Sequence, residues 1–101
     1  MAKKEIVWSN LAKLELSNVL EFYVLRNGNS DYSSKILEEV EDLLETLSNN
    51  ELIGRLTSNK TTRVIPMKTY LLFYEINNDR IEIISFWDNR QSKEKRKVQV
   101  S

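Results

Sequence analysis

Apolar residues in the first half of the chain recur at helical spacing in two stretches. The first stripe consists of Ala12, Leu16, Val19, Leu20 and Tyr23. The second consists of Ile36, Leu37, Val40, Leu43, Leu44 and Leu47. Because apolar side chains three and four residues apart share one face of a helix, the pattern predicts two amphipathic helices. A short polar link joins them, so we expect an antiparallel helical hairpin.

Polar and glycine residues mark the ends of both stretches. Ser9 or Asn10 is suited to cap the first helix, because short polar side chains accept hydrogen bonds from free backbone N–H groups. Asn27-Gly28 predicts its end, since glycine adopts the left-handed conformation at a helix C-terminus without a steric penalty. Ser30 is expected to cap the second helix.

Four stretches have the composition of β-strands. They are Glu5 to Trp8, Arg63 to Met67, Tyr70 to Asn77 and Arg80 to Trp87. Asn78-Asp79 predicts a two-residue turn, and Pro66 is expected at a strand end or bulge because it lacks a backbone N–H. The order predicts an α+β domain: an N-terminal strand, an antiparallel helical hairpin, then a three-stranded antiparallel segment that completes one sheet. We expect residues 1–101 to form a single domain with a basic tail from about residue 91.

The predicted turn also sets which residues of the last two strands face each other, with Ile76 opposite Ile81 and Tyr74 opposite Ile83. Because side chains alternate between the faces of a sheet, one nearly apolar face is expected to pack on the helices. That face consists of Tyr70, Leu72, Tyr74, Ile76, Ile81, Ile83 and Trp87. The other face consists of Leu71, Phe73, Glu75, Glu82, Ile84, Phe86 and Asp88, with Arg90 at its margin. Two helices leave the apolar middle of this second face uncovered. Either it is a partner site, for which such a patch is typical, or the basic tail or residues 48–62 fold over it.

Composition narrows the chemistry that this domain can perform. The chain has no cysteine and no histidine, which excludes thiol nucleophiles, disulfides, thiolate zinc sites and the commonest general base. It contains no phosphate-binding or dinucleotide-binding glycine loop, and we expect neither a metal nor a cofactor. No apolar run reaches the roughly 20 residues that span a bilayer, so we expect no membrane association and a location in the cytoplasm.

Charge is divided unevenly along a chain whose formal net charge is zero. Residues 1–53 contain 5 basic and 10 acidic side chains, whereas residues 54–101 contain 10 basic and 5 acidic ones. The basic half indicates either an acidic or polyanionic partner or simply a second solvated face. Arginine and lysine hold phosphates and stabilise developing negative charge, and nearby aromatic rings stack on bases. The candidate cations are Arg55, Lys60, Arg63, Lys68, Arg90, Lys93, Lys95, Arg96 and Lys97.

Several stretches, taken in order, resemble the RelE/ParE superfamily of bacterial toxins. They are the helix NLAKLELSNVLEFY, the IGRL stretch with Gly54-Arg55, the strand with Arg63, YLLFYEI with Tyr70 and Tyr74, and IEIISFWDNRQ with Arg90. The resemblance extends over nearly the whole chain and depends on the ordered set, since no single motif is specific. It implies a small toxin that a co-expressed antitoxin holds inactive.

The resemblance implies one of two targets. RelE-type members cut mRNA on the ribosome without a metal, through a cleft of basic residues. ParE-type members poison DNA gyrase without a known hydrolytic step of their own. Arg63 and Arg90 match the basic cleft positions and are the candidate catalytic residues. The candidate contacts to RNA or another target are Arg55, Lys60, Trp87 and Lys93, and those to the antitoxin are Leu71, Phe73 and Phe86.

Two features depart from the RelE-type pattern. Leu71 occupies the position after the first tyrosine of the middle strand, where those toxins commonly carry a cation. Residues 91–101 contain no tyrosine or histidine able to serve as acid or base. The sequence therefore leaves mRNA cleavage and gyrase inhibition open, together with an interaction module that retains the fold without toxicity.

Overall fold

Two helices and five strands make up residues 4–88, the part of the chain that this computed structural model describes. In chain order they are β1 (Glu5–Trp8), α1 (Asn10–Asn27), α2 (Asp31–Asn49), β2 (Arg55–Leu56), β3 (Thr62–Met67), β4 (Tyr70–Ile76) and β5 (Arg80–Asp88). The predicted α+β class and the order of strand, helical hairpin and three strands are confirmed. The sequence does not predict β2, because a strand of two residues has no periodicity.

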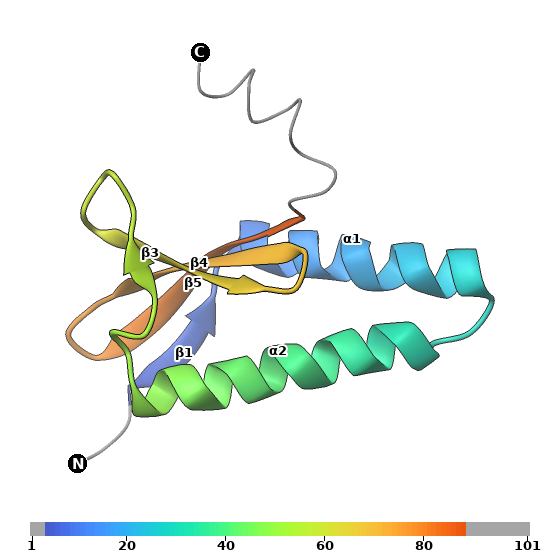
Figure 1. Cartoon of the computed structure of the whole chain (residues 1–101), viewed down its shortest axis with the longest axis horizontal. Helices are drawn as coiled ribbons and strands as arrows, with labels where there is room; N and C mark the ends of the chain where they lie inside the picture. The colour runs from blue at the N-terminus through green and yellow to red at the C-terminus, as the bar shows by residue number, and fades with distance from the viewer. Residues whose placement is uncertain (1–3, 89–101) are drawn as a thin grey trace.

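The strands form one sheet in the order β1-β5-β4-β3-β2. β1 runs parallel to β5, and all other neighbours are antiparallel. Both helices pack on the same face of the sheet, and the turn that joins them lies beyond its margin (Figure 1). Neither helix covers the opposite face.

The helix ends follow most of the local signals. The Ser9 hydroxyl accepts a hydrogen bond from a backbone nitrogen of the first turn at 3.0 Å, and Gly28 ends α1 with a φ of 75°. Ser30 precedes α2, but its side chain makes no capping hydrogen bond. The Asn29 side chain accepts from the Asp31 backbone nitrogen instead, at 3.0 Å. Neither helix of the described part is long and apolar enough to cross a membrane.

The core lies between the helices and one face of the sheet. Its buried apolar side chains are Ala12, Ile36, Val40, Leu47, Ile65, Tyr70, Leu72, Tyr74, Ile81, Ile83 and Phe86. Three of them, Ile36, Val40 and Leu47, belong to the predicted stripe of α2. Burying a large apolar side chain contributes roughly 1.5–3 kcal/mol, so the packing of this face fixes the register of the strands.

The turns between the last three strands differ in detail from expectation. The two-residue turn at Asn78-Asp79 is present, although neither residue has a positive φ. The β3–β4 turn contains Lys68 at φ 57°, and its ammonium group lies 2.7 Å from the Glu39 carboxylate of α2. Pro66 lies in β3 beyond the residues that pair with β2, so its missing N–H breaks no ladder with that strand.

A bulge in β5 changes the face on which its last residues lie. The predicted pairs Ile76–Ile81 and Tyr74–Ile83 are confirmed. The preceding residue of β4 then pairs with Ser85, so one residue of β5 between Ile83 and Ser85 is left without a partner. Because side chains alternate along a strand, one inserted residue exchanges the faces of every residue that follows.

The prediction that Phe86 lies on the uncovered face is therefore wrong. Phe86 is 1% exposed, pairs with Leu72 and stacks on Tyr70 with ring centroids 4.9 Å apart. Trp87, predicted for the packed face, instead pairs with Leu71 on the uncovered face and is half-buried.

On the edge of β5 away from β4, a side chain of α1 rather than a strand holds the far end. β1 pairs with β5 only as far as Ile83. Beyond that point Oε1 of Glu15 accepts hydrogen bonds from the Phe86 backbone nitrogen at 2.9 Å and from the Ser85 hydroxyl at 2.8 Å. Because a buried backbone N–H requires an acceptor, this carboxylate takes the place of a neighbouring strand.

Candidate functional site

The uncovered face of the sheet carries a groove of about 440 Å³. Val64, Pro66, Leu71 and Phe73 form its apolar floor. Val64 pairs with Phe73 and Pro66 with Leu71, so the four side chains lie in two adjacent rows on one face. Leu71 and Phe73 are only half-buried, as expected for the uncovered face. The domain thus presents an apolar hollow on the side that its helices leave open.

β2 and the residue before Gly54 form one rim of this groove. Ile53 and Leu56 line the groove and are 45% and 46% exposed. Arg55 also lines it, since its pairing with Val64 directs its side chain to the groove side. Among the described residues, no carboxylate lies within ion-pair distance of Arg55. The rim therefore offers a guanidinium group beside exposed apolar side chains, a combination enriched at protein–protein contacts.

One asparagine fixes the loop between β2 and β3. Oδ1 of Asn59 accepts hydrogen bonds from the backbone nitrogens of Thr61 and Thr62 at 2.9 and 2.8 Å. Lys60 lies in this loop with a φ of 65°; it is exposed and does not line the groove. Arg55 and Lys60 are both predicted to contact the target. The structure brings Arg55 to the groove but leaves Lys60 outside it.

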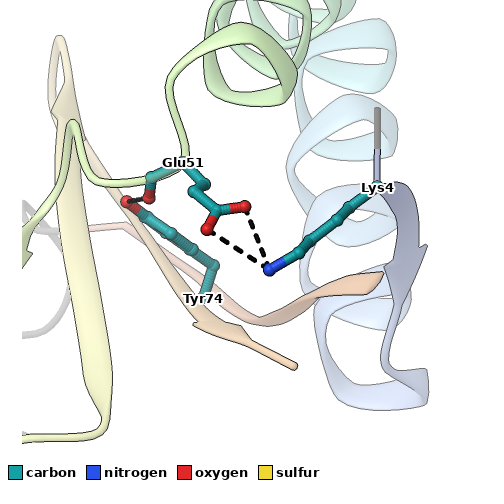
Figure 2. Close-up of polar contacts among 3 residues, drawn as sticks. All are labelled: Lys4, Glu51 and Tyr74. Atoms are coloured by element: carbon teal, nitrogen blue, oxygen red, sulfur yellow. Dashed lines mark hydrogen bonds and ion pairs between the residues drawn. The ribbon is translucent and has the colours of Figure 1, made fainter. Parts of the chain in front are cut away.

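A buried tyrosine fixes the backbone that leads to Arg55. The Tyr74 hydroxyl donates to the Glu51 backbone oxygen at 2.7 Å and accepts from the Gly54 backbone nitrogen at 2.8 Å. Figure 2 shows this hydroxyl at the Glu51 carbonyl and the Lys4 ammonium group at the Glu51 carboxylate, 3.1 Å away. Residues 51–54 are thereby attached both to the middle of β4 and to the residue before β1.

Gly54 is required by the close approach of the Tyr74 ring. A Cβ atom at residue 54 would lie 2.7 Å from both Cε1 and the hydroxyl oxygen of Tyr74, closer than nonbonded atoms approach. Glycine therefore admits the ring, and the ring in turn holds the backbone next to Arg55. The contact explains why glycine, and no larger residue, precedes Arg55.

The Tyr74 hydroxyl is a structural donor. Burial raises the pKa of this hydroxyl above its ordinary value of 10.0, while the Gly54 N–H and the Arg63 guanidinium oppose the rise. The group is therefore protonated near neutral pH, as its hydrogen bond to Glu51 requires. Tyr74 is 0% exposed, so a molecule in the groove does not reach its proton.

Arg63, a predicted catalytic residue, lies on the other side of the sheet from the groove. It pairs with Tyr74, and its Nη1 donates to the Gly54 backbone oxygen at 2.6 Å. Adjacent residues of a strand point to opposite faces, so Val64 lines the groove and Arg63 does not. Arg63 is thus not brought to the groove, although the resemblance matches it to a basic cleft position.

The other predicted site residues lie in different parts of the structure or outside its described residues. Trp87 lies on the groove side of the sheet, next to Leu71, without lining the groove itself. Phe86 is buried in the core and is removed from the candidate antitoxin contacts. Arg90 and Lys93 lie outside the described residues, and their predicted roles stay predictions.

The chemistry available in the groove is that of binding. The described residues that line it include one guanidinium group and no carboxylate or other side chain that titrates near neutral pH. Such a surface accepts an apolar side chain together with a carboxylate or phosphate. Within residues 4–88, no group of three or more His, Cys, Asp or Glu side chains is arranged to hold a metal ion.

A comparison with protein families identifies the relationship. Residues 6–93 match the model of the ParE toxin of type II toxin-antitoxin system, parDE. The chain belongs to the ParE toxin family. The match extends from β1 through β5, and it confirms the resemblance to the RelE/ParE superfamily that the ordered motifs indicate.

Solved structures of toxin–antitoxin proteins share the fold. A chain of the chromosomal ParDE TA system from P. aeruginosa is 16% identical and superimposes with a TM-score of 0.72 over 85% of this chain and 96% of that chain. A chain of the YoeB dimer from Staphylococcus aureus, also 16% identical, gives a TM-score of 0.61 over 85% and 97% of the two chains. At this identity the likeness shows the fold alone. No curated protein sequence matches the chain.

Two side chains make long-range contacts that the sequence does not predict. Alternation along the strand correctly places Tyr74 on the packed face, but its hydrogen bonds to Gly54 and Glu51, 20 and 23 positions away, have no local signal. Glu15 contacts Ser85 and Phe86, which are 70 and 71 positions away in the chain. No local pattern marks Glu15 as different from the other acidic residues of the helices.

Proposed function

We propose that this ParE-family toxin inhibits growth in the cytoplasm by binding DNA gyrase through the groove, and that its cognate antitoxin prevents this. The observation that carries the proposal is the make-up of the groove, in which Arg55 stands beside an apolar floor with Leu71 and Phe73. Exposed apolar hollows with a cation at the margin are typical of protein-binding surfaces. A protein target fits this surface better than an RNA backbone, which requires several converging cations.

Among residues 4–88, the side chains that line the groove do not include the groups that RNA cleavage requires. Attack of a 2′-hydroxyl on its phosphate needs a poised acid or base and cations around the developing charge. Leu71 stands where RelE-type toxins commonly carry a cation, and Arg63 is engaged with the Gly54 carbonyl on the opposite face. The chain also has no histidine. These features favour a toxin that acts by binding, as expected of ParE-type members.

The same groove suits a segment of the antitoxin. Leu71 and Phe73 offer apolar contacts, and Arg55 offers a charge-assisted hydrogen bond to a carboxylate. An antitoxin segment with apolar and acidic side chains would fill the groove and exclude the target. Neutralisation is then competition for one surface.

Two assays with the purified chain test the target. We expect the chain to inhibit supercoiling of relaxed plasmid DNA by gyrase, to leave translation by purified ribosomes unaffected, and to lose its effect when the cognate antitoxin is added. Arg55→Ala is expected to weaken the inhibition about tenfold or more, the loss typical of a hot-spot arginine. Lys60→Ala is the matched control, because Lys60 is an exposed cation outside the groove, and we expect it to act like the wild type.

Other outcomes would contradict the proposal. Arrested translation with cleaved mRNA would support a metal-independent endoribonuclease instead, for which Trp87, Arg90 and Lys93 are the candidate contacts. Normal growth of the host during expression of the chain, with neither activity in vitro, would support an interaction module that has kept the fold and lost toxicity.

A further inference from the structure

The outer face of α1 is apolar, where a surface helix is normally polar. Leu11, Leu14, Phe22 and Leu25 are 54%, 57%, 43% and 77% exposed. At the 100° rotation per residue of an α-helix, these four side chains and Asn18 fall within about 80° of the circumference. We call these five residues the outer stripe. It lies on the far side of α1 from Ala12, which is fully buried in the core.

The outer stripe is a special feature of α1. The corresponding side of α2 is charged; its exposed acidic residues are Glu38, Glu41, Asp42 and Glu45. No residue of the outer stripe lines the groove, and all five are exposed to solvent within the described part of the chain. Figure 1 shows α1 extending with α2 past the margin of the sheet.

The spacing of the outer stripe is symmetric about Asn18. Leu11 and Leu25 each lie seven residues from Asn18, and Leu14 and Phe22 each lie four residues from it. Two such helices in antiparallel contact therefore bring Leu11 of one copy to Leu25 of the other, and Leu14 to Phe22. A two-fold contact requires a surface that matches itself in this way.

Asn18 has the chemistry that the centre of such a contact requires. Its amide both donates and accepts hydrogen bonds, so two Asn18 side chains satisfy each other across a two-fold axis. In coiled coils, a single asparagine among apolar contact residues sets the register of the paired helices, and Asn18 has the same place in the outer stripe. Glu15 and Glu21 border the stripe on opposite sides, so an antiparallel contact does not set one against the other. Glu15 is also engaged with Phe86.

We propose that the outer stripe is a self-association surface, to which α1 of a second copy binds antiparallel with the two Asn18 side chains at the two-fold axis. The stripe from Leu11 to Leu25 is about 21 Å long at 1.5 Å per residue. A contact of this length and one helix wide is at the low end of interface sizes, so the dimer dissociates in the micromolar range. The inference does not depend on the target of the toxin, because the groove lies on a different surface.

Engineered cysteines test the register directly, since the chain has none of its own. Asn18→Cys is expected to form a disulfide-linked dimer under mild oxidation, because the two Cβ atoms face each other across the axis. Leu25→Cys is the matched control: antiparallel pairing separates the two copies of residue 25 by about 21 Å, and we expect no cross-link. Equal cross-linking of both variants, or none at residue 18, would overturn the proposed contact.

Sedimentation velocity from about 1 µM to about 200 µM tests the association itself over the range expected of a small interface. We expect a reversible dimer for the wild type and a monomer for Leu14→Asp and Leu25→Asp, with the fold of each checked by circular dichroism. Leu52→Asp changes a leucine that is 61% exposed but lies outside α1, and it is expected to dimerise like the wild type. A wild-type chain that stays monomeric throughout would contradict self-association.

Discussion

The hydroxyl oxygen of Tyr74 lies 2.8 Å from the backbone nitrogen of Gly54, so a buried ring in the middle of β4 holds the rim of the groove. The contact depends on the missing side chain of Gly54, because a Cβ atom there would meet the ring at 2.7 Å. Arg55 follows directly and faces the groove. The position of the groove's cation is thus set by packing on the opposite side of the sheet.

Gly54→Ala is expected to lower the free energy of unfolding by about 1–3 kcal/mol, the usual cost of forcing an extra carbon into a packed site. Urea unfolding measures this loss. Gly28→Ala is an informative control, because no atom lies within 4 Å of a Cβ at that position, and its φ of 75° is the source of strain. The left-handed conformation costs an alanine roughly 1–2 kcal/mol. An unchanged unfolding free energy for Gly54→Ala would contradict the close packing of the Tyr74 ring.

The raised pKa of Tyr74 predicts a loss of stability in alkali. In the unfolded chain this hydroxyl ionises near its ordinary value of 10.0, whereas burial retains the proton in the folded state. The contribution is complete below the unfolded pKa and is lost as pH rises through the higher folded pKa. Between about pH 9 and pH 11 the unfolding free energy should therefore fall more steeply for the wild type than for Tyr74→Phe. If the unfolding free energies of the two proteins fall in parallel, ionisation of Tyr74 does not cause the loss of stability in alkali.

Glu15→Ala is expected to destabilise the far end of β5 by about 1.5–3 kcal/mol, the range for hydrogen bonds to a charged group. Hydrogen exchange at the Phe86 amide should accelerate correspondingly, because this amide donates to Glu15. Glu15→Gln should retain most of the protection, since both hydrogen bonds end on one oxygen that an amide carbonyl can replace. Glu21→Ala removes an exposed acid from the same helix and should leave the exchange unchanged. If hydrogen exchange at the Phe86 amide is unaltered in Glu15→Ala, the Glu15 carboxylate does not protect this edge of β5.

Truncation of Phe86 should mainly reduce stability, whereas truncation of Phe73 should mainly reduce target binding. Phe86→Ala removes a ring that is 1% exposed, and we expect a loss of about 3–5 kcal/mol in unfolding free energy. Phe73 is only half-buried on the groove floor, so Phe73→Ala should lose less stability while weakening target binding. Thermal unfolding and a binding assay on the same samples separate the two effects. Equal losses of stability would mean that the faces of β5 are wrongly assigned.

The sequence predicts most of the fold because the apolar stripes, the helix ends and the strand order are local signals. It does not predict the bulge in β5. Ile84 is apolar and suits either face, so alternation continues without any visible break while Phe86 and Trp87 exchange faces. The same limit applies to Arg63. Its charge indicates a functional cation, but its face depends on its pairing with Tyr74 of the next strand, a register that charge does not reveal.

The groove itself is predicted in part. Leu71 and Phe73 follow from alternation along a strand whose register the turn correctly indicates. The contribution of Ile53, Arg55 and Leu56 depends on the two-residue β2, for which a sequence pattern offers no signal. Contacts between distant segments, rather than local propensity, therefore complete the site.

The most direct measurement is inhibition of gyrase supercoiling by Leu71→Asp, which places a carboxylate on the groove floor. Leu71 lies on the uncovered face and only half-buried, so we expect the variant to fold, as circular dichroism would verify. Target binding through the groove predicts that the concentration for half-inhibition rises about tenfold or more, the loss expected when a charge replaces an apolar interface contact. A folded Leu71→Asp chain that inhibits gyrase as strongly as the wild type would contradict the assignment of the groove as the gyrase-binding surface.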